Sequence, residues 1–344
     1  MVRNEWSDSL RSDGADIVET GSEFAEAPSS ISMGYLGKLR TIATLAAYLR
    51  DNQALVSRHD VVNLHNWPSY VAAWTARLLR RGRPPIVWTC NEPTEFWFSK
   101  NPVLRYHLHL IEKRAIKQLP AIVVLSTYMQ KHLMAKYGAE STIIAPGVDP
   151  PGDAKETLQD RPAKKQRLDI VCYTRMAFFP VQVLESLLPR EPGAVLHLFG
   201  SRAMHAYRYA IRRGLQASVQ VHGWMPESDM VDFIASMDVM IFPHLAPFGL
   251  ASVEALAVGV PVVSIAAGGQ LDIIKDGFNG YTVASANPET FANAISSHLS
   301  TILSREMRLR CAVDAAQRFS WDRAADQYLR LFEDVEHRGV NPDW

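Results

Sequence analysis

One stretch, residues 238–283, constrains the fold of this 344-residue chain more than any other part. An apolar run at 239–242 predicts a buried strand, and a run of small apolar residues at 250–258 predicts a helix that begins after a turn at Gly249. A second β-branched run follows at 262–265. Strand, turn, helix and strand in this order form a parallel crossover unit, so the stretch predicts a parallel α/β sheet.

A crossover unit of this kind offers a binding site for phosphate. The N-terminus of its helix and free backbone N–H groups point toward the carboxyl edge of the sheet, where an anion is stabilised. The helix at 250–258 contains one acidic residue, Glu254, among apolar neighbours. A carboxylate in a buried helix is unfavourable without a partner, which favours a ligand-facing Glu254 over the alternative, a solvated helix residue. The unit therefore predicts a phosphate-carrying ligand whose identity stays open.

Strands and helices alternate over most of the chain, which predicts an α/β fold with doubly wound parallel sheets. The chain length suggests two domains. The charged, turn-rich segment 151–167 reads as a linker between an N-terminal lobe, 1–150, and a C-terminal lobe, 168–318, with a final helical segment at 319–344. The predicted strands span residues 15–20, 60–65, 85–90, 121–125, 142–145, 168–173, 194–199, 219–222, 239–242, 262–265 and 281–283. The predicted helices span residues 2–12, 39–49, 70–81, 103–118, 127–137, 181–188, 202–213, 228–236, 250–258, 288–303, 305–317 and 321–337.

Polar residues follow two predicted strands of the N-terminal lobe. His65 ends the strand at 60–65, and Asn91 and Glu92 follow the strand at 85–90. Ligands of doubly wound sheets bind beyond the carboxyl ends of the strands, so these side chains are candidates for sugar or acceptor contacts. The alternatives are that Glu92 caps the next helix and that His65 packs within a turn.

The charge distribution restricts the partners. The formal net charge is zero and the isoelectric point is near 7.2, which argues against nucleic acid as a partner. Between Lys38 and Lys136, however, fifteen basic and five acidic residues leave an excess of ten positive charges. This excess is either a solvated surface or a face for an anionic partner, such as a membrane or an acidic acceptor.

Cysteine, histidine and hydropathy patterns limit the cofactors and the compartment. The three cysteines, Cys90, Cys172 and Cys311, are far apart, which predicts a reducing compartment and no disulfide framework. No histidine lies in a zinc-type pattern, so neither a metal nor another cofactor is predicted. The polar N-terminus is no signal peptide, and no apolar run approaches about 18 residues, the length that spans a membrane. A cytoplasmic protein is predicted, with a peripheral position at the inner face of the membrane as a further expectation.

Several ordered motifs carry a family resemblance. The stretch 238–283 contains, in order, Pro247-Phe-Gly-Leu250, Glu254-Ala-Leu-Ala-Val-Gly259, Pro261-Val-Val263 and the turn Gly268-Gly269. They resemble the retaining, nucleotide-sugar-dependent glycosyltransferases of the two-lobed GT-B fold, group 1 or family 4-like. The resemblance is closest over residues 168–335, and Phe319-Ser-Trp321 is similar to the point where the family's last helix crosses back to the first lobe.

The resemblance implies roles for individual residues. Glu254 would bind the ribose hydroxyls of the donor, and Arg175 would neutralise the diphosphate. A departing nucleoside diphosphate needs stabilisation of its charge, and a site without metal supplies it from arginine and helix N-termini. With the candidates at the strand ends included, the predicted donor-binding set is Phe248, Gly249, Leu250, Glu254, Gly268, Gly269 and His65, and the predicted catalytic set is Arg175, Asn91 and Glu92.

The sequence departs from the family pattern at four places. Ala246 replaces the family's first glutamate, no lysine follows Arg175 at the usual spacing, and Asn91 replaces a histidine. The chain also begins where the first helix is expected, so the N-terminal lobe is predicted to lack its first strand. Asn91 can hydrogen-bond a sugar hydroxyl but cannot act as a titrating base.

Three functions are compatible with these residues. The first is a glycosyltransferase that transfers a sugar, with retention and without metal, from a nucleotide-diphosphate sugar to a glycan, a lipid-linked molecule or another acceptor. The second is a catalytically impaired GT-B homologue that acts as a binding or partner subunit. The third keeps the fold and changes the reaction, as in a sugar-nucleotide epimerase.

Overall fold

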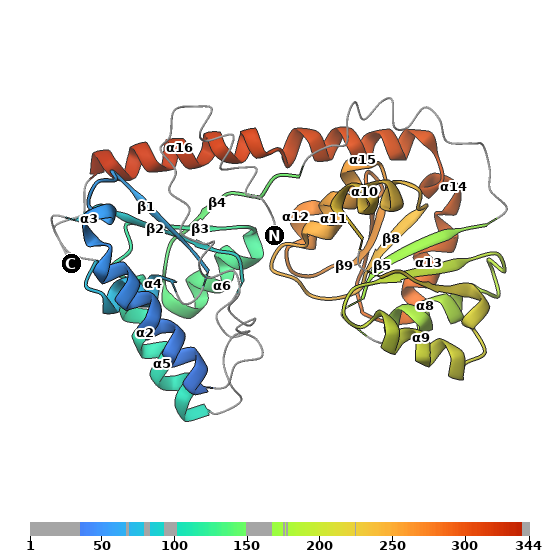
Figure 1. Cartoon of the computed structure of the whole chain (residues 1–344). Coiled ribbons are helices and arrows are strands. Elements are labelled where there is room, and N and C mark those ends of the chain that lie inside the picture. Colours follow the sequence, from blue (N-terminus) through green and yellow to red (C-terminus); the bar gives the residue numbers. More distant parts are fainter. Residues whose placement is uncertain are drawn as a thin grey trace. The chain divides into compact units, whose positions relative to one another are not determined.

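The computed structural model describes residues 35–66, 69–78, 83–92, 102–148, 167–174, 176, 178–223 and 225–338. The chain divides into two compact units, one of Met1–Ala145 with Trp321–Trp344 and one of Pro146–Ser320. Each unit contains its own parallel sheet with helices (Figure 1). The predicted fold class, two doubly wound parallel α/β lobes, is therefore confirmed. The helix predicted at 2–12 and the strand predicted at 15–20 lie outside the described residues.

The sheet of the first unit has four strands in the order β1-β2-β3-β4. Its register places Leu64, Trp88 and Ile122 side by side on adjacent strands. All five residues of β2 are buried, because both faces of this central strand are covered. The strands are β1 (Val62–His65), β2 (Ile86–Cys90), β3 (Ala121–Val124) and β4 (Thr142–Ile143).

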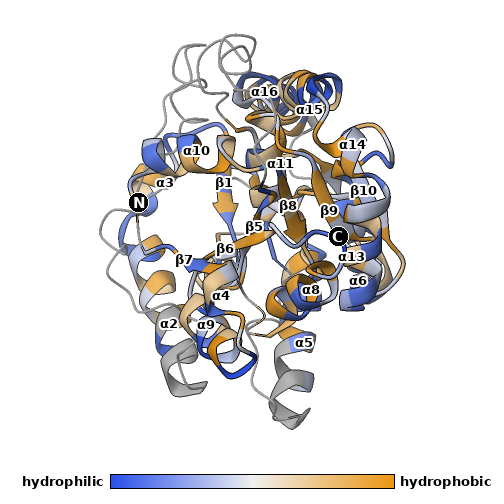
Figure 2. Ribbon diagram, turned by 90° about the vertical axis from the view of Figure 1, so that its right-hand side faces the viewer, coloured by the Kyte–Doolittle hydropathy of each residue, from blue (hydrophilic) through white to orange (hydrophobic). Residues whose placement is uncertain are grey.

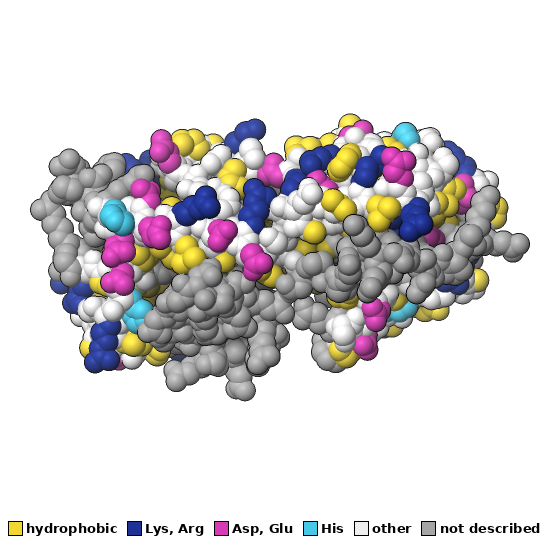
Figure 3. All heavy atoms as spheres, turned by 90° about the horizontal axis from the view of Figure 1, so that it is seen from above, with side chains coloured by type: hydrophobic (Ala, Val, Ile, Leu, Met, Phe, Trp, Pro, Cys, Tyr) yellow, Lys and Arg dark blue, Asp and Glu magenta, His cyan; other side chains and the backbone are white. Residues whose placement is uncertain are grey.

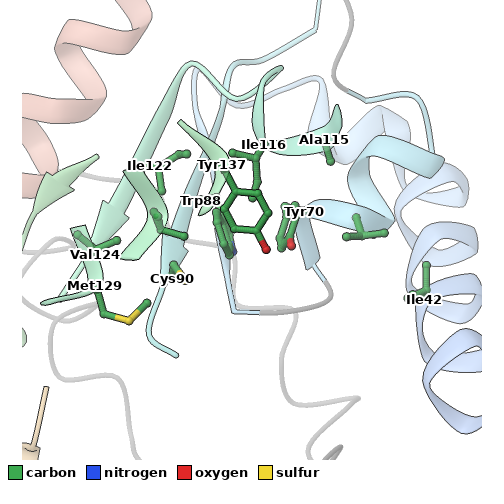
Figure 4. Packing of buried hydrophobic residues seen from close by; sticks show 12 residues of the cluster. Ile42, Tyr70, Trp88, Cys90, Ala115, Ile116, Ile122, Val124, Met129 and Tyr137 are labelled. Carbon is green, nitrogen blue, oxygen red and sulfur yellow. The ribbon is translucent and has the colours of Figure 1, made fainter. Parts of the chain in front are cut away.

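Side chains of β2 alternate between two cores. Trp88 and Cys90 face helices of one layer and pack in a cluster with Tyr70, whose ring centroid lies 4.1 Å from that of Trp88 (Figure 4). Val87 faces the opposite side and packs against Tyr328 of the C-terminal helix α16. The alternation is the period-two pattern that a strand buried on both faces requires. The helices of this unit are α2 (Tyr35–Asp51), α3 (Gln53–Val56), α4 (Ser69–Thr75), α5 (Pro102–Ile116), α6 (Thr127–Tyr137) and α16 (Trp321–Arg338).

A buried carboxylate lies inside the first of these cores. Glu112 accepts hydrogen bonds from the hydroxyl groups of Tyr70 and Tyr137, both at 2.8 Å. Burial, together with the nearby charge of Glu112, raises the pKa of Tyr70 well above its usual value. Because the hydroxyl group of Tyr70 stays protonated, it remains a donor to the carboxylate.

The sheet of the second unit has six strands in the order β10-β9-β8-β5-β6-β7. The direction of winding reverses between β5 and β8, which is the switch point where such sheets bind ligands. Figure 2 shows β8 and β9 as hydrophobic strands, consistent with helices on both faces. The strands are β5 (Asp169–Tyr173), β6 (Val195–Phe199), β7 (Val219–Val221), β8 (Val239–Phe242), β9 (Val262–Ile265) and β10 (Gly280–Val283).

Helices cover both faces of this sheet (Figure 1). One layer contains α8 (Phe179–Leu187), α9 (Ala203–Arg212) and α13 (Pro288–Ser297). The other contains α10 (Glu227–Ala235), α11 (Leu250–Ala257) and α15 (Arg305–Arg318). Shorter helical turns connect these elements at η3 (Gln216–Ser218), α12 (Gln270–Ile273) and α14 (Leu299–Ile302).

Two predicted helices differ from the structure. The helix predicted at 70–81 ends at Thr75, and the positive φ of 59° at Arg77 takes the chain out of the helical conformation. The helix predicted at 288–303 is interrupted at His298, whose ring stacks on Tyr281 at 3.9 Å. Both interruptions depend on local conformation or tertiary contacts, which the hydropathy pattern does not contain.

The turn before β10 is held by α15. Asn279 is buried, its Nδ2 donates to Asp314 Oδ2 at 3.0 Å, and its Oδ1 accepts from the backbone N–H of Lys275 at 2.8 Å. Asp314 also accepts from Lys275 Nζ at 2.5 Å and from Arg318 at 2.7 Å. The turn Asp276-Gly-Phe-Asn-Gly280 therefore supports the sheet through a polar network.

This network predicts how acid affects the stability of the second unit. Burial acts to raise the pKa of Asp314, but hydrogen bonds from Lys275 and Arg318 and their charges outweigh it and lower the pKa. A carboxyl whose pKa is lower in the folded than in the unfolded state stabilises the fold above its unfolded pKa of about 3.9, and this contribution is lost as pH falls through the folded pKa. We expect Asp314→Asn to be less stable than the parent at neutral pH, with a difference that shrinks in acid.

Urea denaturation of both proteins between neutral pH and about pH 3 measures this difference. Asp232→Asn, at an exposed position of α10, is the control: it measures how much the same substitution changes stability at the surface. A difference between parent and Asp314→Asn that stays constant across this pH range would show that the charge of Asp314 is not what stabilises the turn.

Candidate functional site

The loop between β8 and α11 presents free backbone donors at a helix N-terminus. Gly249 has φ +115°, a conformation that favours glycine, and it directly precedes the first residue of α11, Leu250. The backbone N–H groups of Phe248, Gly249 and Leu250 donate no hydrogen bond to any described residue. Adjacent free N–H groups at a helix N-terminus form an anion-binding arrangement.

A buried glutamine fixes the shape of this loop. Gln270 is fully buried, its Nε2 donates to the carbonyl of Phe248 at 3.1 Å, and its Oε1 accepts from Ser252 Oγ at 2.9 Å. One side chain thus joins the β8–α11 loop to the first turn of α11 and to α12. The sequence prediction missed Gln270, although a polar residue directly after a Gly-Gly turn between apolar segments was an available signal.

Gly268 and Gly269 lie in the loop after β9 and are buried against the β8–α11 loop. The N–H of Gly269 donates to the carbonyl of Ala246 at 3.0 Å. A Cβ atom at either glycine would overlap backbone atoms of that loop. The structure accounts for these glycines by close packing, and direct contact with a ligand stays a prediction.

Glu254 lies on the open side of α11. Residues 252–264 are otherwise buried, and Glu254 alone among them is exposed. Leu250, one turn earlier on the same side of the helix, is 41% exposed. The carboxylate therefore avoids the burial that would be unfavourable for it, and it is accessible one turn from the free N–H groups.

Ala246 and Arg175 bear on the charge of this site. Ala246 is buried, and its carbonyl is bound by Gly269, so the position contributes no acidic group. Arg175 lies outside the described residues. The adjacent Thr174 follows β5, and its N–H donates to the carbonyl of Phe199 at the end of β6 at 2.7 Å.

In the first unit, Asn66 connects the ends of β1 and β2. Its N–H donates to the carbonyl of Thr89 at 2.9 Å, and its Oδ1 accepts from the N–H of Asn91 at 3.2 Å. The predicted residues His65, Asn91 and Glu92 consequently lie at one edge of the sheet. The helix that Glu92 was alternatively expected to cap begins at Pro102.

The imidazole of His65 is neutral near neutral pH. Desolvation by the surrounding atoms lowers its pKa to about 4, although part of the side chain remains exposed. Its Nε2 lies 3.2 Å from Asn63 Nδ2. A neutral imidazole beside the amide of Asn63 suits hydrogen bonding to hydroxyl groups better than binding an anion.

Neither a metal-binding cluster nor a membrane-spanning helix occurs in the described ranges. These residues contain no group of three or more His, Cys, Asp or Glu side chains arranged to hold a metal ion. None of their helices combines the length and the apolar character that crossing a bilayer requires. Cys90, Cys172 and Cys311 are buried and form no disulfide, and burial raises the pKa of the Cys172 thiol to about 12.

Fold and site together define a two-lobed α/β protein whose second lobe presents backbone N–H groups at a helix N-terminus. The family model described as Glycosyl transferases group 1 matches residues 178–318, and the model described as Glycosyltransferase Family 4 matches residues 6–151. The chain belongs to the glycosyltransferases of the GT-B fold. The predictions of this fold and of an enzyme of this class are confirmed.

Individual relatives agree with this assignment. The chain is 28% identical over 312 residues to the D-inositol 3-phosphate glycosyltransferase of Xylanimonas cellulosilytica, covering 81% of this chain and 73% of the relative. It is similar in structure to sucrose-phosphate synthase from Thermosynechococcus elongatus, with a TM-score of 0.74, 17% identity and coverage of 96% and 91% of the two chains. Anabaena HepE, solved in complex with UDP, gives a TM-score of 0.65 at 17% identity, with coverage of 88% and 85%.

Proposed function

We propose that this glycosyltransferase transfers a sugar, with retention and without metal, from a nucleoside diphosphate sugar. The observation that carries the proposal is the juxtaposition on α11 of the free N–H groups of Phe248, Gly249 and Leu250 with the exposed Glu254. The N–H groups and the helix dipole bind the diphosphate, and Glu254 binds the ribose hydroxyls. A uridine nucleotide is the first candidate, since the HepE and TarM structures similar to this one contain UDP.

The chemistry required of the chain is stabilisation of the leaving group. As the glycosidic bond to the diphosphate breaks, negative charge grows on the departing phosphate oxygens. Fixed N–H donors at the helix N-terminus stabilise this charge because they are already oriented before the reaction, and Arg175 is expected to supply a full positive charge. Retention follows if the acceptor attacks from the face that the diphosphate leaves.

The acceptor is proposed to be anionic or lipid-linked. The segment between Lys38 and Lys136 has an excess of ten positive charges, which favours an anionic acceptor. Two relatives are named D-inositol 3-phosphate glycosyltransferase, and the compound in that name contains a phosphate group. His65, Asn91 and Glu92 are the proposed acceptor or sugar contacts in this lobe. In Figure 3 the visible face carries both basic and acidic side chains, so that face gives no support to peripheral membrane contact.

Calorimetry with UDP-, GDP- and ADP-sugars, followed by NMR of the product anomer, tests the function. We expect binding of one donor and transfer with retained configuration in the presence of EDTA. Absence of binding at millimolar concentrations would contradict a donor site. If the protein binds a nucleotide sugar but transfers the sugar to no acceptor, the result favours a partner subunit. If it converts the nucleotide sugar into another one in the absence of an acceptor, the result indicates an epimerase.

A further inference from the structure

Helix α9 of the second unit has an outer face that the proposed function does not use. Its inner face is made of small residues, Ala203, Ala206 and Ala210, which are buried where the helix packs on β6, β7 and α8. The side chains on the opposite side of the helix are exposed to solvent. This outer face consists of Met204, His205, Arg208, Ile211 and Arg212.

Apolar side chains lie along both edges of the outer face. Met204 is 51% exposed, and Ile211, on the same side of the helix two turns later, is 50% exposed. At the other edge, the ring of Tyr209 packs on Phe178, which is 49% exposed, with the centroids 4.9 Å apart. Contact between these apolar groups and water is unfavourable, so a partner that covers them gains free energy.

The charge between these edges is positive. Residues 192–226 contain four arginines and no acidic residue. The elements that pack most against α9 contain one acidic residue, Glu185 of α8, and it pairs with Arg213. Arg208 and Arg212 form no ion pair with any described residue, and Arg212 Nε donates only to the backbone carbonyl of Arg208. The outer face therefore presents two uncompensated guanidinium groups between apolar edges.

This combination favours an anionic lipid bilayer as the partner. A hydrated polyanion such as nucleic acid would contact the arginines but would leave the aliphatic side chains in water. At a bilayer surface, guanidinium groups reach the lipid phosphates, while neighbouring aliphatic side chains enter the boundary between headgroups and acyl chains. The outer side of a helix is also convex, a shape that a deformable lipid layer accommodates without a preformed groove.

We propose that the outer face of α9 docks the protein on a membrane that contains anionic lipids. Arg208 and Arg212 bind lipid phosphates, and Met204 and Ile211 insert beside them. The inference goes beyond the proposed function, since α9 carries none of the residues assigned to the donor or the acceptor. It also differs from the sequence-based expectation of membrane contact, which concerned the basic segment of the first unit.

Co-sedimentation of the full chain with lipid vesicles tests the inference. We expect binding to vesicles of phosphatidylglycerol and phosphatidylcholine, and none to vesicles of phosphatidylcholine alone. Arg208→Ala and Arg212→Ala should each weaken binding about fivefold, the contribution of one basic residue near an anionic membrane. Ile211→Ser keeps every charge and should weaken binding by a similar factor, about fivefold, because less apolar surface leaves water.

Two exposed residues of the same unit outside α9 provide matched controls. Arg305→Ala, at the start of α15, and Leu303→Ser, directly after α14, should change vesicle binding less than about twofold. Circular dichroism checks that each variant is folded. Calorimetry with UDP, GDP and ADP should give the parent's affinities in every variant, so a failure of nucleotide binding would count against the proposed function and not against docking.

Three results would overturn the inference. The first is absence of parent binding to the anionic vesicles. The second is vesicle binding that the α9 variants leave unchanged, which would place the contact on another surface, such as the basic segment of the first unit. The third is binding to a single-stranded oligonucleotide in place of vesicles, lost in Arg208→Ala and Arg212→Ala, which would identify α9 as a polyanion site.

Discussion

Glu254→Ala is expected to lower kcat/KM for the nucleotide-sugar donor about 100-fold, because hydrogen bonds between a carboxylate and ribose hydroxyls contribute about 1.5–3 kcal/mol each. The ribose does not react, so the loss should fall mainly on KM and little on kcat. Glu254 is exposed on α11, which means that its replacement leaves no cavity in the core. Initial rates over a range of donor concentrations, combined with calorimetry of the free nucleotide, measure the effect.

A matched exposed glutamate separates binding from surface charge. Glu306 lies on α15 of the same unit and forms an ion pair with Arg310, one turn along the helix. Glu306→Ala removes the same charge away from the proposed donor site. We therefore expect it to change kcat/KM less than about twofold, as is usual for a surface substitution. If Glu254→Ala binds the nucleotide as tightly as the parent, Glu254 does not bind the ribose.

Gly269→Ala is expected to lower the free energy of unfolding of the second unit by about 3 kcal/mol, the upper range for forcing an atom into a packed interior. The φ of Gly269 is −67°, an ordinary value for alanine, so the backbone conformation itself adds no strain. The added Cβ would overlap backbone atoms of Pro247 and Phe248, which cannot rotate away as a side chain can. The loop that carries the free N–H groups must move instead, and nucleotide affinity should fall with stability. Chemical denaturation and calorimetry measure the two effects.

Gly277→Ala is the informative comparison. Gly277 has φ +71°, but no atom lies within 4 Å of a Cβ placed there. We expect a loss of about 1–2 kcal/mol from the left-handed conformation and no change in nucleotide affinity. Equal losses of affinity in the two variants would show that Gly269 does not act through the β8–α11 loop.

Elements with local signals were predictable from the sequence. Helix α6 has the predicted bounds, because Ser126 caps its N-terminus with a hydrogen bond to Met129 and Gly138 ends it with φ +67°. Strands β8 and β9 also have the predicted bounds, since a run of four mostly apolar residues is too short for a helix and favours a buried strand. The single-turn helices α3 and α12 were missed, because four residues are too short to show a helical period.

The site was predictable where it depends on one continuous segment. The free N–H groups at Phe248 to Leu250 follow from the turn and helix that the sequence encodes in order. The exposure of Glu254 was not predictable, because apolar neighbours on a short helix suggested burial, and only the packing of α11 against α15 and the sheet leaves one side open.

What the sequence determined by itself is the alternation of strands and helices, the β8–α11–β9 unit and the glycosyltransferase family of the chain. The tertiary structure decided which distant side chains meet. Gln270 clamps Phe248 and Ser252, and Asp169, His197 and His222 align across three strands. The physical reason is that capping, turns and periodicity act between residues close in the chain, whereas hydrogen bonds between separate loops and strands depend on the order in which a sheet assembles them.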